Sequence, residues 1–239
     1  MNRVLRIILL FSPLMSIGQD TTTTKHKLLI GVSYSPDYCY RTLTRNDKSI
    51  PDSTWNSLKN FADSIETAKF GYTTGINICY YFNENLSIES GVLYSNKGDK
   101  TIPIKTFLID SYGNVSPVNA SFTSSYTYLD FPLTVNYTFF KKRIKLVVGV
   151  GATLSVYLNS TLTSDPKEAL VLVVSDKFTG NKINISPTVS VGAQYQLNDK
   201  MSLRLAPTYR YGILGIYDAD IKTHLWTVGI NIGYYYKLK

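Results

Sequence analysis

The chain has 239 residues, enough for one large all-β domain or two small domains. Its formal net charge is +8, but its lysines are scattered and do not cluster with aromatic residues in one motif, which argues against nucleic-acid binding. The two cysteines, Cys39 and Cys79, are too few for a disulfide framework, and we expect two small buried side chains at opposite ends of neighbouring strands.

The first 18 residues have the pattern of a secretory signal peptide. Arg3 and Arg6 form a positive segment, an apolar segment spans 7–15, and small residues precede a cleavage point near Gln19. An uncleaved anchor or a buried helix is the alternative, but the apolar run is short for a membrane-spanning helix. We therefore predict an exported protein with one mature domain over 19–239.

Downstream, eight segments alternate between apolar and polar residues with the period of two that is typical of β-strands. No apolar run there is long enough for a membrane helix, so the exported chain is expected either to be soluble or to cross a membrane as a closed barrel. The strands are predicted over 27–40, 69–82, 86–97, 126–140, 144–159, 182–197, 201–213 and 221–238. A short helix is expected within 53–70.

The connections between these strands alternate in length. Three are tight and polar, at 83–85, 141–143 and 198–200. The others are long, at about 41–68, 98–125 and 160–181, with a shorter one near 214–220. Short turns at one end and long loops at the other are typical of outer-membrane barrels, whereas a soluble lipocalin-like barrel does not need this asymmetry. An even strand number places both termini at the tight-turn end.

The two faces of each strand differ in size as well as polarity. Over 144–159, one face carries Leu146, Val148 and Val150 while the other carries Gly149 and Gly151. The interior of an eight-stranded barrel is only just wide enough for side chains, so the bulky face is predicted to point outward to lipid. A β-sandwich or a soluble barrel is the alternative, but its solvent face would be unusually poor in charge and rich in glycine.

Aromatic residues gather at two levels along the predicted strands, separated by Val, Ile and Leu, which matches the interfacial girdles of membrane barrels. The prolines at 132, 187 and 207 cannot donate to a strand ladder. We expect bulges or local gaps in pairing at these three positions.

The same alternation places charged residues inside the predicted barrel. Glu89 and Arg204 lie at a similar distance from the tight turns, and Asp130 and Arg210 lie nearer the long loops. Because unpaired buried charge is costly, we predict the contacts Glu89–Arg204 and Asp130–Arg210, with Lys97 and Lys145 nearby. This network is expected to plug the lumen, and ion or proton conduction is the alternative.

No motif in the sequence predicts a catalytic, cofactor-binding or metal-binding site. Phosphate loops, HExxH, CxxC and nucleophile elbows are missing, and no His and carboxylate cluster has metal-ligand spacing. The two histidines are His26, before the first strand, and His224, which opens the last strand. His224 with a nearby loop Ser or Asp is a candidate for lipid-modifying chemistry, but a lone rim histidine is more often a surface residue.

Three segments resemble a known family. They are "SGVLYSNKGD" at 90–99, "YLDFPLTVNYTFF" at 128–140 and "YRYGILGI" at 209–216. In this order and spacing they are similar to the PorT-like small outer-membrane β-barrels of Bacteroidota. The resemblance implies an outer-membrane location and no catalytic activity. Such chains commonly end on an aromatic residue, whereas this one ends Tyr236-Lys237-Leu238-Lys239.

Together these observations predict an all-β protein: an eight-stranded antiparallel up-and-down transmembrane β-barrel with short periplasmic turns, long extracellular loops and both termini in the periplasm. Its expected role is structural or interactive, as an accessory or scaffold component of the cell envelope with a plugged lumen. Expected partners are outer-membrane lipid, lipopolysaccharide and a larger outer-membrane protein complex. A lipid-modifying enzyme and a small-solute pore remain the alternatives.

Overall fold

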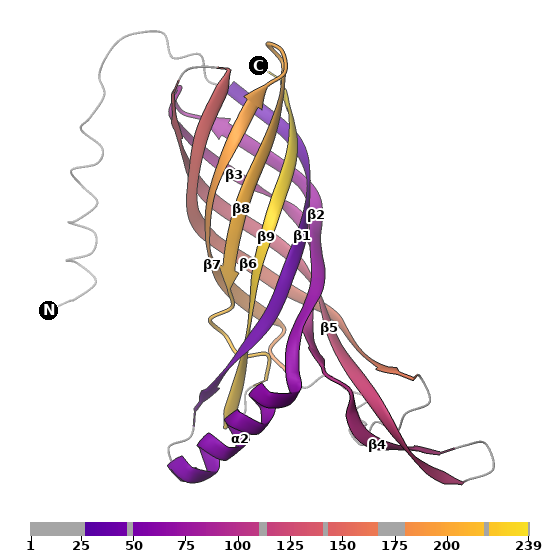
Figure 1. Cartoon of the computed structure of the whole chain (residues 1–239). Coiled ribbons are helices and arrows are strands. Elements are labelled where there is room, and N and C mark those ends of the chain that lie inside the picture. Colours follow the sequence, from indigo (N-terminus) through magenta and orange to yellow (C-terminus); the bar gives the residue numbers. More distant parts are fainter. Residues whose placement is uncertain are drawn as a thin grey trace, which may run out of the picture.

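The computed structural model describes residues 27–46, 50–109, 114–140, 143–166, 180–217 and 220–238, so the predicted signal peptide and His26 lie outside the described residues. Nine strands and one helix occupy this part of the chain (Figure 1). They are β1 (Lys27–Arg45), α2 (Asp52–Ile65), β2 (Glu66–Tyr81), β3 (Leu86–Thr101), β4 (Ile104–Ile109), β5 (Val115–Phe139), β6 (Ile144–Asp165), β7 (Ile183–Gln196), β8 (Met201–Tyr211) and β9 (Ile221–Lys237).

Eight of these strands close into a ring. The hydrogen-bonded order is β3-β2-β1-β9-β8-β7-β6-β5, and antiparallel pairing of β3 with β5 joins the two ends. The ninth strand, β4, pairs only with the part of β5 that extends beyond the ring. The prediction of an eight-stranded antiparallel barrel is therefore confirmed. Closure leaves the ring without an edge, which satisfies its backbone groups without water.

The two ends of the ring differ as the connection lengths predict. At the tight-turn end, the Asn83 side chain accepts hydrogen bonds from the backbone N–H groups of Asn85 and Leu86. The Asn198 side chain accepts hydrogen bonds from those of Lys200 and Met201 in the same way. Short polar side chains thus shape these turns locally. The described chain also starts and finishes there, because the Leu238 N–H donates to the Leu28 carbonyl.

At the opposite, extended end, the prediction of long loops is only partly correct. Most of the described part of 98–125 is paired strand, because β4 covers 104–109 and β5 begins at Val115. In 160–181, β6 continues to Asp165, and residues 167–179 lie outside the described residues. These Ser- and Thr-rich segments still have β propensity, so they continue the hairpins after leaving the ring. Residues 158–163 are exposed on both faces of the strand, as expected for a strand surrounded by water. The predicted helix is present as α2.

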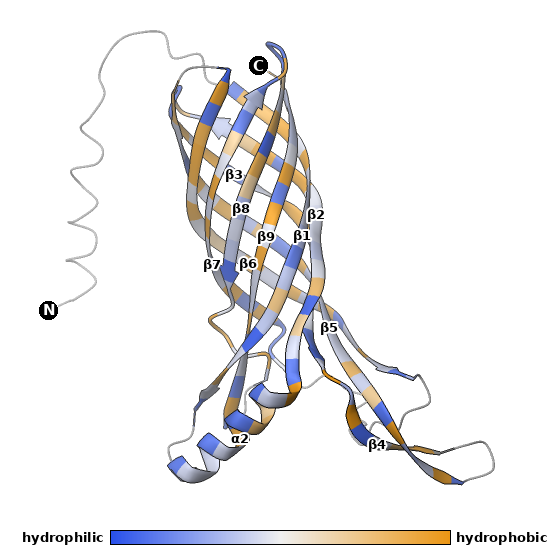
Figure 2. Cartoon of the chain, in the orientation of Figure 1, coloured by the Kyte–Doolittle hydropathy of each residue, from blue (hydrophilic) through white to orange (hydrophobic). Residues whose placement is uncertain are grey.

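The outer surface of the ring is apolar and its interior is polar, as predicted. Figure 2 shows apolar and polar residues alternating along the strands. Leu133 and Ile230 are exposed on the outside, whereas Asn136, Thr153 and many other hydroxyl and amide side chains are buried inside. Among the described residues, no helix is both long and apolar enough to cross a membrane.

Aromatic side chains contact one another at both rims of the outer surface. Near the tight turns, the Tyr137 and Phe139 ring centroids are 4.7 Å apart. Near the extended end, Tyr38 lies 6.0 Å from Phe70 and 6.3 Å from Trp226. These contacts place two aromatic girdles around a Val-, Ile- and Leu-rich band.

The cysteines and the prolines also lie as expected. Both cysteines are free and buried, Cys39 toward the extended end and Cys79 toward the tight turns. Within the described pairing, each proline has a partner on one neighbouring strand only. Pro132 faces Thr153 of β6 but no residue on β3, Pro187 faces Ala152 of β6 but none on β8, and Pro207 faces Ile230 of β9 but none on β7. The missing N–H is thus accommodated by local gaps in otherwise continuous ladders.

The environment of the outer face can be tested with an introduced charge. Leu133 is 56% exposed in the middle of the outer band, and Leu162 is 44% exposed on the part of β6 beyond the ring. We expect Leu133→Arg to lower the free energy of unfolding in lipid vesicles by about 2–4 kcal/mol, because it places a charge near the bilayer midplane. Leu162→Arg, in water, is expected to change it by less than about 0.5 kcal/mol.

Urea titration of folding into phosphatidylcholine vesicles measures both values. Equal effects of the two substitutions would show that the apolar band does not contact hydrocarbon.

Candidate functional site

A cluster of charged and polar side chains crosses the lumen near the tight-turn end. Arg204 on β8 forms a 2.5 Å ion pair with Glu89 on β3, from the opposite wall of the ring. The Tyr235 hydroxyl donates to the same carboxylate at 2.7 Å, and the Asn136 amide donates to it at 3.2 Å. Gln194 accepts two hydrogen bonds from the guanidinium, at 3.0 and 3.2 Å. We call this cluster the lower layer, counting from the tight turns, which are at the top of Figure 1.

The lower layer compensates its charges in several ways at once. The Arg204 guanidinium also lies 4.5 Å from the centroid of the Tyr235 ring, a cation–π contact. Both Arg204 and Tyr235 are buried. An ion pair removed from water contributes to stability only when its remaining donors and acceptors are also satisfied, and here the tyrosine and two amides supply those partners.

A second cluster, the upper layer, lies closer to the extended end. Asp37 on β1 is fully buried and accepts hydrogen bonds from Ser35 at 2.6 Å and from Thr73 at 2.5 Å. Arg210 on β8 faces it, with 3.7 Å between Nη1 and Oδ1. The carboxylate passes so close to Gly229 that a Cβ there would lie 1.8 Å from Oδ1. Glycine at this position therefore makes room for the buried carboxylate.

The predicted contact between Asp130 and Arg210 is wrong. Asp130 instead pairs with Lys97 at 2.9 Å, and Arg210 pairs with Asp37; we count both ion pairs as the upper layer. The strand register gives the physical reason. Lys97 lies on the same face of β3 as Leu93, which pairs with Asp130. Asp37 pairs with Gly229, which pairs with Thr208, two residues from Arg210. Lys145 is not near this cluster, since it lines the mouth of the ring at the tight-turn end.

Asp37 is the lumen residue that the sequence analysis missed. It belongs to the series Ser33, Ser35, Asp37, Cys39, Arg41, which alternates with bulky residues along β1. All five side chains are buried. The alternation that identified the other lumen charges could therefore have identified this one.

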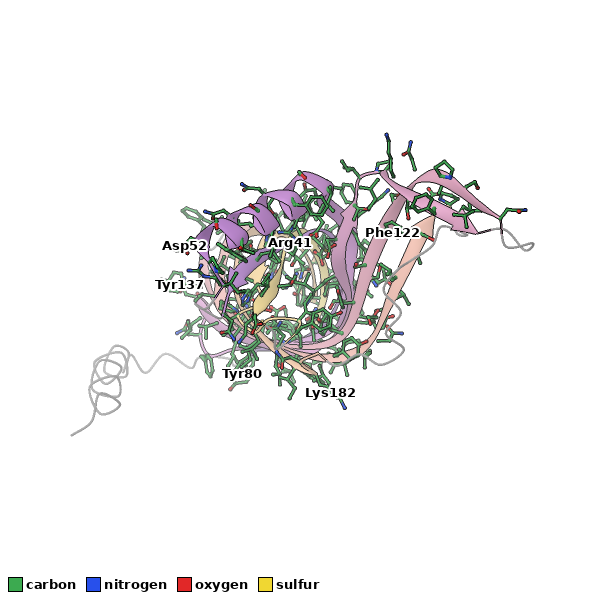
Figure 3. All side chains as sticks on the ribbon, turned by 90° about the horizontal axis from the view of Figure 1, so that it is seen from below. Arg41, Asp52, Tyr80, Phe122, Tyr137 and Lys182 are labelled. Atoms are coloured by element: carbon green, nitrogen blue, oxygen red, sulfur yellow. The ribbon has the colours of Figure 1, made fainter. Side chains whose placement is uncertain are left out.

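Apolar side chains close the lumen at the extended end. Tyr126, Tyr128, Ile216 and Leu225 form one buried cluster, with Tyr157 packed against it. Ile216 comes from the connection between β8 and β9, which is held in place by backbone hydrogen bonds to Asn181 and Thr223. Figure 3, seen from below, shows side chains filling the interior of the ring. Between the two charged layers remains a polar cavity of about 50 Å³, room for no more than a few water molecules.

Beyond the outer aromatic girdle, ion pairs attach α2 to the ring. The buried Arg41 guanidinium contacts Asp63 of α2 at 2.8 Å and also pairs with Glu66 at the start of β2. No residue of α2 is buried, so this attachment holds a helix that otherwise faces solvent.

Burial, together with the nearby Glu66 carboxylate, raises the pKa of Asp99 at the same end to about 6.

His224 is buried, which differs from the expected rim position. One ring nitrogen, Nδ1, lies 3.0 Å from the Gly212 carbonyl, and Nε2 lies 2.8 Å from the Thr44 hydroxyl. The ring also stacks on Tyr211, with centroids 5.9 Å apart. These contacts pack the histidine between β1, β9 and the adjoining connection. Among the described residues, no group of three or more His, Cys, Asp or Glu side chains could hold a metal ion.

Comparison with known proteins gives a family match. Residues 8–234 match the family model described as "Outer membrane protein beta-barrel domain". None of the curated proteins matches the chain.

Solved structures similar to the chain include three outer-membrane proteins. Neisserial surface protein A is 13% identical, with coverage of 86% of this chain and 95% of that one and a TM-score of 0.44. OprG from Pseudomonas aeruginosa is 11% identical, with coverage of 89% and 95% and a TM-score of 0.42. The outer-membrane protease OmpT from Escherichia coli is 10% identical, with coverage of 92% and 100% and a TM-score of 0.39. The family match carries the assignment, and these likenesses add nothing to it.

Breaking the lower layer is expected to destabilise the barrel strongly. Arg204→Ala leaves the Glu89 carboxylate largely buried without its cation, so we expect a loss of about 3–5 kcal/mol in the free energy of unfolding, measured with urea in lipid vesicles. The matched control is Arg45→Ala, whose partner Asp52 is exposed, and which is expected to cost at most about 1 kcal/mol.

The double variant Glu89→Gln/Arg204→Gln removes both charges and should recover part of the loss. A double variant less stable than Arg204→Ala would contradict the role of charge compensation.

Proposed function

The chain belongs to the outer membrane protein β-barrel domain family, and from this premise we propose that it serves as a closed, non-enzymatic barrel that presents an interaction platform at the cell surface. It is an integral outer-membrane β-barrel protein. The observation that carries the proposal is the sealed lumen, which is blocked by two charged layers and one aromatic cluster. With the interior closed, the exposed features left for function are the outer wall, the projecting extended end and the tight-turn mouth.

The proposed orientation places the tight turns and both termini in the periplasm and the extended end outside the cell. Outer-membrane barrels have short periplasmic turns and longer extracellular connections, and the described chain has both of its outer limits at the tight-turn end. A signal peptide over residues 1–18, removed after export, leaves the barrel domain over 19–239 and supports the same orientation.

We further propose membership of the PorT-like barrels of Bacteroidota. The three motifs that carry this resemblance contribute residues to the lumen. Lys97, in the first motif, pairs with Asp130 in the second, and Arg210, in the third, pairs with Asp37. The basic residues of the first and third motifs therefore neutralise the buried carboxylates of the upper layer. This role is a structural reason for the motifs to recur in the family.

The extended end offers the surface for a larger outer-membrane complex. The α2 helix carries Leu58 and Phe61 exposed on one side, and the hairpin of β4 and β5 exposes Phe107 and Val115. Figure 1 shows the hairpin projecting sideways from the ring. Leu58 and Phe61 lie three residues apart on the helix, and exposed apolar patches in water commonly mark interaction sites. The outer wall is proposed to contact lipid and lipopolysaccharide.

The two alternative functions lack support from the site geometry. A lipid-modifying enzyme needs a nucleophile, a base and a group that orients the base, whereas the contacts of His224 are a backbone carbonyl, a threonine and a tyrosine ring. A small-solute pore needs a continuous water path, whereas the lower layer crosses the lumen from β8 to β3 and buried apolar side chains close the extended end.

Conductance measurement separates the plugged barrel from the pore. The purified protein in planar bilayers is expected to give no stable openings, because the narrow lumen is filled by side chains. A porin inserted in parallel verifies that the bilayers report channels. Stable openings on the nanosiemens scale would refute the plugged barrel.

Cross-linking in cells tests the interaction platform. After cross-linking and extraction in mild detergent, we expect the native protein in a larger complex that is reduced at least fivefold by Leu58→Glu/Phe61→Glu on α2. The control Ser57→Glu/Asn60→Glu adds the same charge to exposed polar positions of the helix and is expected to leave the complex intact. Recovery of the native protein only as a monomer, or equal effects of both variants, would reject the platform.

A further inference from the structure

A cavity of about 820 Å³ opens at the tight-turn end of the ring. Its wall includes the first residues of β1, the last residues of β9 and the turns before β6 and β8. We call this cavity the basic vestibule. Its size falls in the range of small-molecule sites, and no residue of the vestibule belongs to the two charged layers except Gln194.

The lining of the vestibule carries an excess of positive charge. Among the described residues, five basic residues line it against two acidic residues, Glu84 and Asp199. The basic residues are Lys27, Arg143, Lys145, Lys200 and Lys237. They come from four separate places in the sequence, so only the closed ring brings them to one cavity.

Three of the lysines are directed inward by the strand alternation. Each of them lies two residues along its strand from a buried lumen residue, and therefore on the same face. In this way Lys27 shares a face with Leu29 on β1, Lys237 with Tyr235 on β9, and Lys145 with Val147 on β6. All three lysines are half-buried. Within the described part of the chain, none of them takes part in an ion pair with a carboxylate. This differs from the interior of the lumen, where each Arg or Lys side chain of the two layers has a carboxylate partner.

The vestibule is closed at its inner end. Tyr81 and Gln194 lie at its floor, where the tyrosine hydroxyl lies 3.5 Å from the amide oxygen. Behind them is the lower layer, in which Glu89 and Arg204 neutralise each other. The cavity is therefore a blind pocket with a neutral interior.

At its mouth, Arg143 lies over the Tyr195 ring and Glu84 acts electrostatically on Lys145, but among the described residues Lys27, Lys145 and Lys237 have no carboxylate within ion-pair distance. Low-dielectric walls around charges of one sign concentrate counter-ions of the opposite sign.

We propose that the basic vestibule binds a small molecule that carries two or more phosphate oxyanion groups, such as a diphosphate. Lysine ammonium groups bind phosphate oxyanions as point charges without a fixed orientation. Several of them around one blind pocket can neutralise the multiple negative charges that a diphosphate carries. The phosphate belongs either to a soluble molecule or to a lipid headgroup, and this inference does not depend on which side of the membrane the vestibule faces.

Calorimetric titration of the full-length protein in non-ionic detergent tests the proposal. The probes are inorganic pyrophosphate and a short-chain phosphatidic acid, each at about 0.1 M salt, where distant charges are screened. We expect saturable binding of at least one probe. Binding of pyrophosphate indicates a soluble ligand, and binding of phosphatidic acid alone indicates a lipid headgroup.

Matched variants separate the vestibule from general positive charge. Lys27→Gln/Lys145→Gln is expected to weaken binding at least tenfold. The control Lys59→Gln/Lys105→Gln removes the same charge from exposed positions at the other end and is expected to change affinity less than twofold. A heat-modifiability gel verifies that each variant is folded.

A variant with less negative charge keeps the test decisive if the lysine variant does not fold. Asp199→Asn removes one of the two acidic residues of the vestibule and is expected to tighten binding severalfold. No saturable binding of either probe, equal weakening by both lysine variants, or no gain from Asp199→Asn would overturn the proposal.

Discussion

The structure depends on one constraint: an eight-stranded ring must pair all of its backbone groups while leaving an interior only as wide as side chains. Closure through the β3–β5 pairing satisfies the backbone. It also divides every strand into an outward and an inward face. Outward positions carry Val, Ile, Leu and aromatic residues, and inward positions carry Gly, Ser, Thr and Asn. Bulky apolar residues on both faces would not fit in such a ring.

The same narrowness decides how charge is arranged. Inside the ring, each cation of the two layers meets a carboxylate, because an unpaired charge there has no water to solvate it. At the tight-turn mouth the lysines are partly exposed to solvent, which can solvate their charge without carboxylate partners. At the extended end the strands leave the ring, Arg41 holds α2, and apolar side chains are exposed. A neutral plug thus separates a basic mouth from a projecting platform.

The lumen site shows what one-dimensional reasoning can predict and what it misses. Alternation correctly placed Glu89, Asp130, Arg204 and Arg210 inside the ring. Glu89 and Arg204 do pair, at similar distances from their tight turns. Asp130 and Arg210 do not pair, because the strand register brings Lys97 and Asp37 closer to them. His224 is buried for a related reason: the connection after β8 folds over it.

The sequence by itself determined the number of ring strands, their boundaries at the tight turns, the outward face and the position of α2, because these depend on periodicity and local turn chemistry. Only the tertiary structure decided the ion-pair partners, the aromatic closure, the continuation of strands beyond the ring and the gathering of five basic residues at one mouth. Those features depend on register and ring closure, which join residues far apart in the chain.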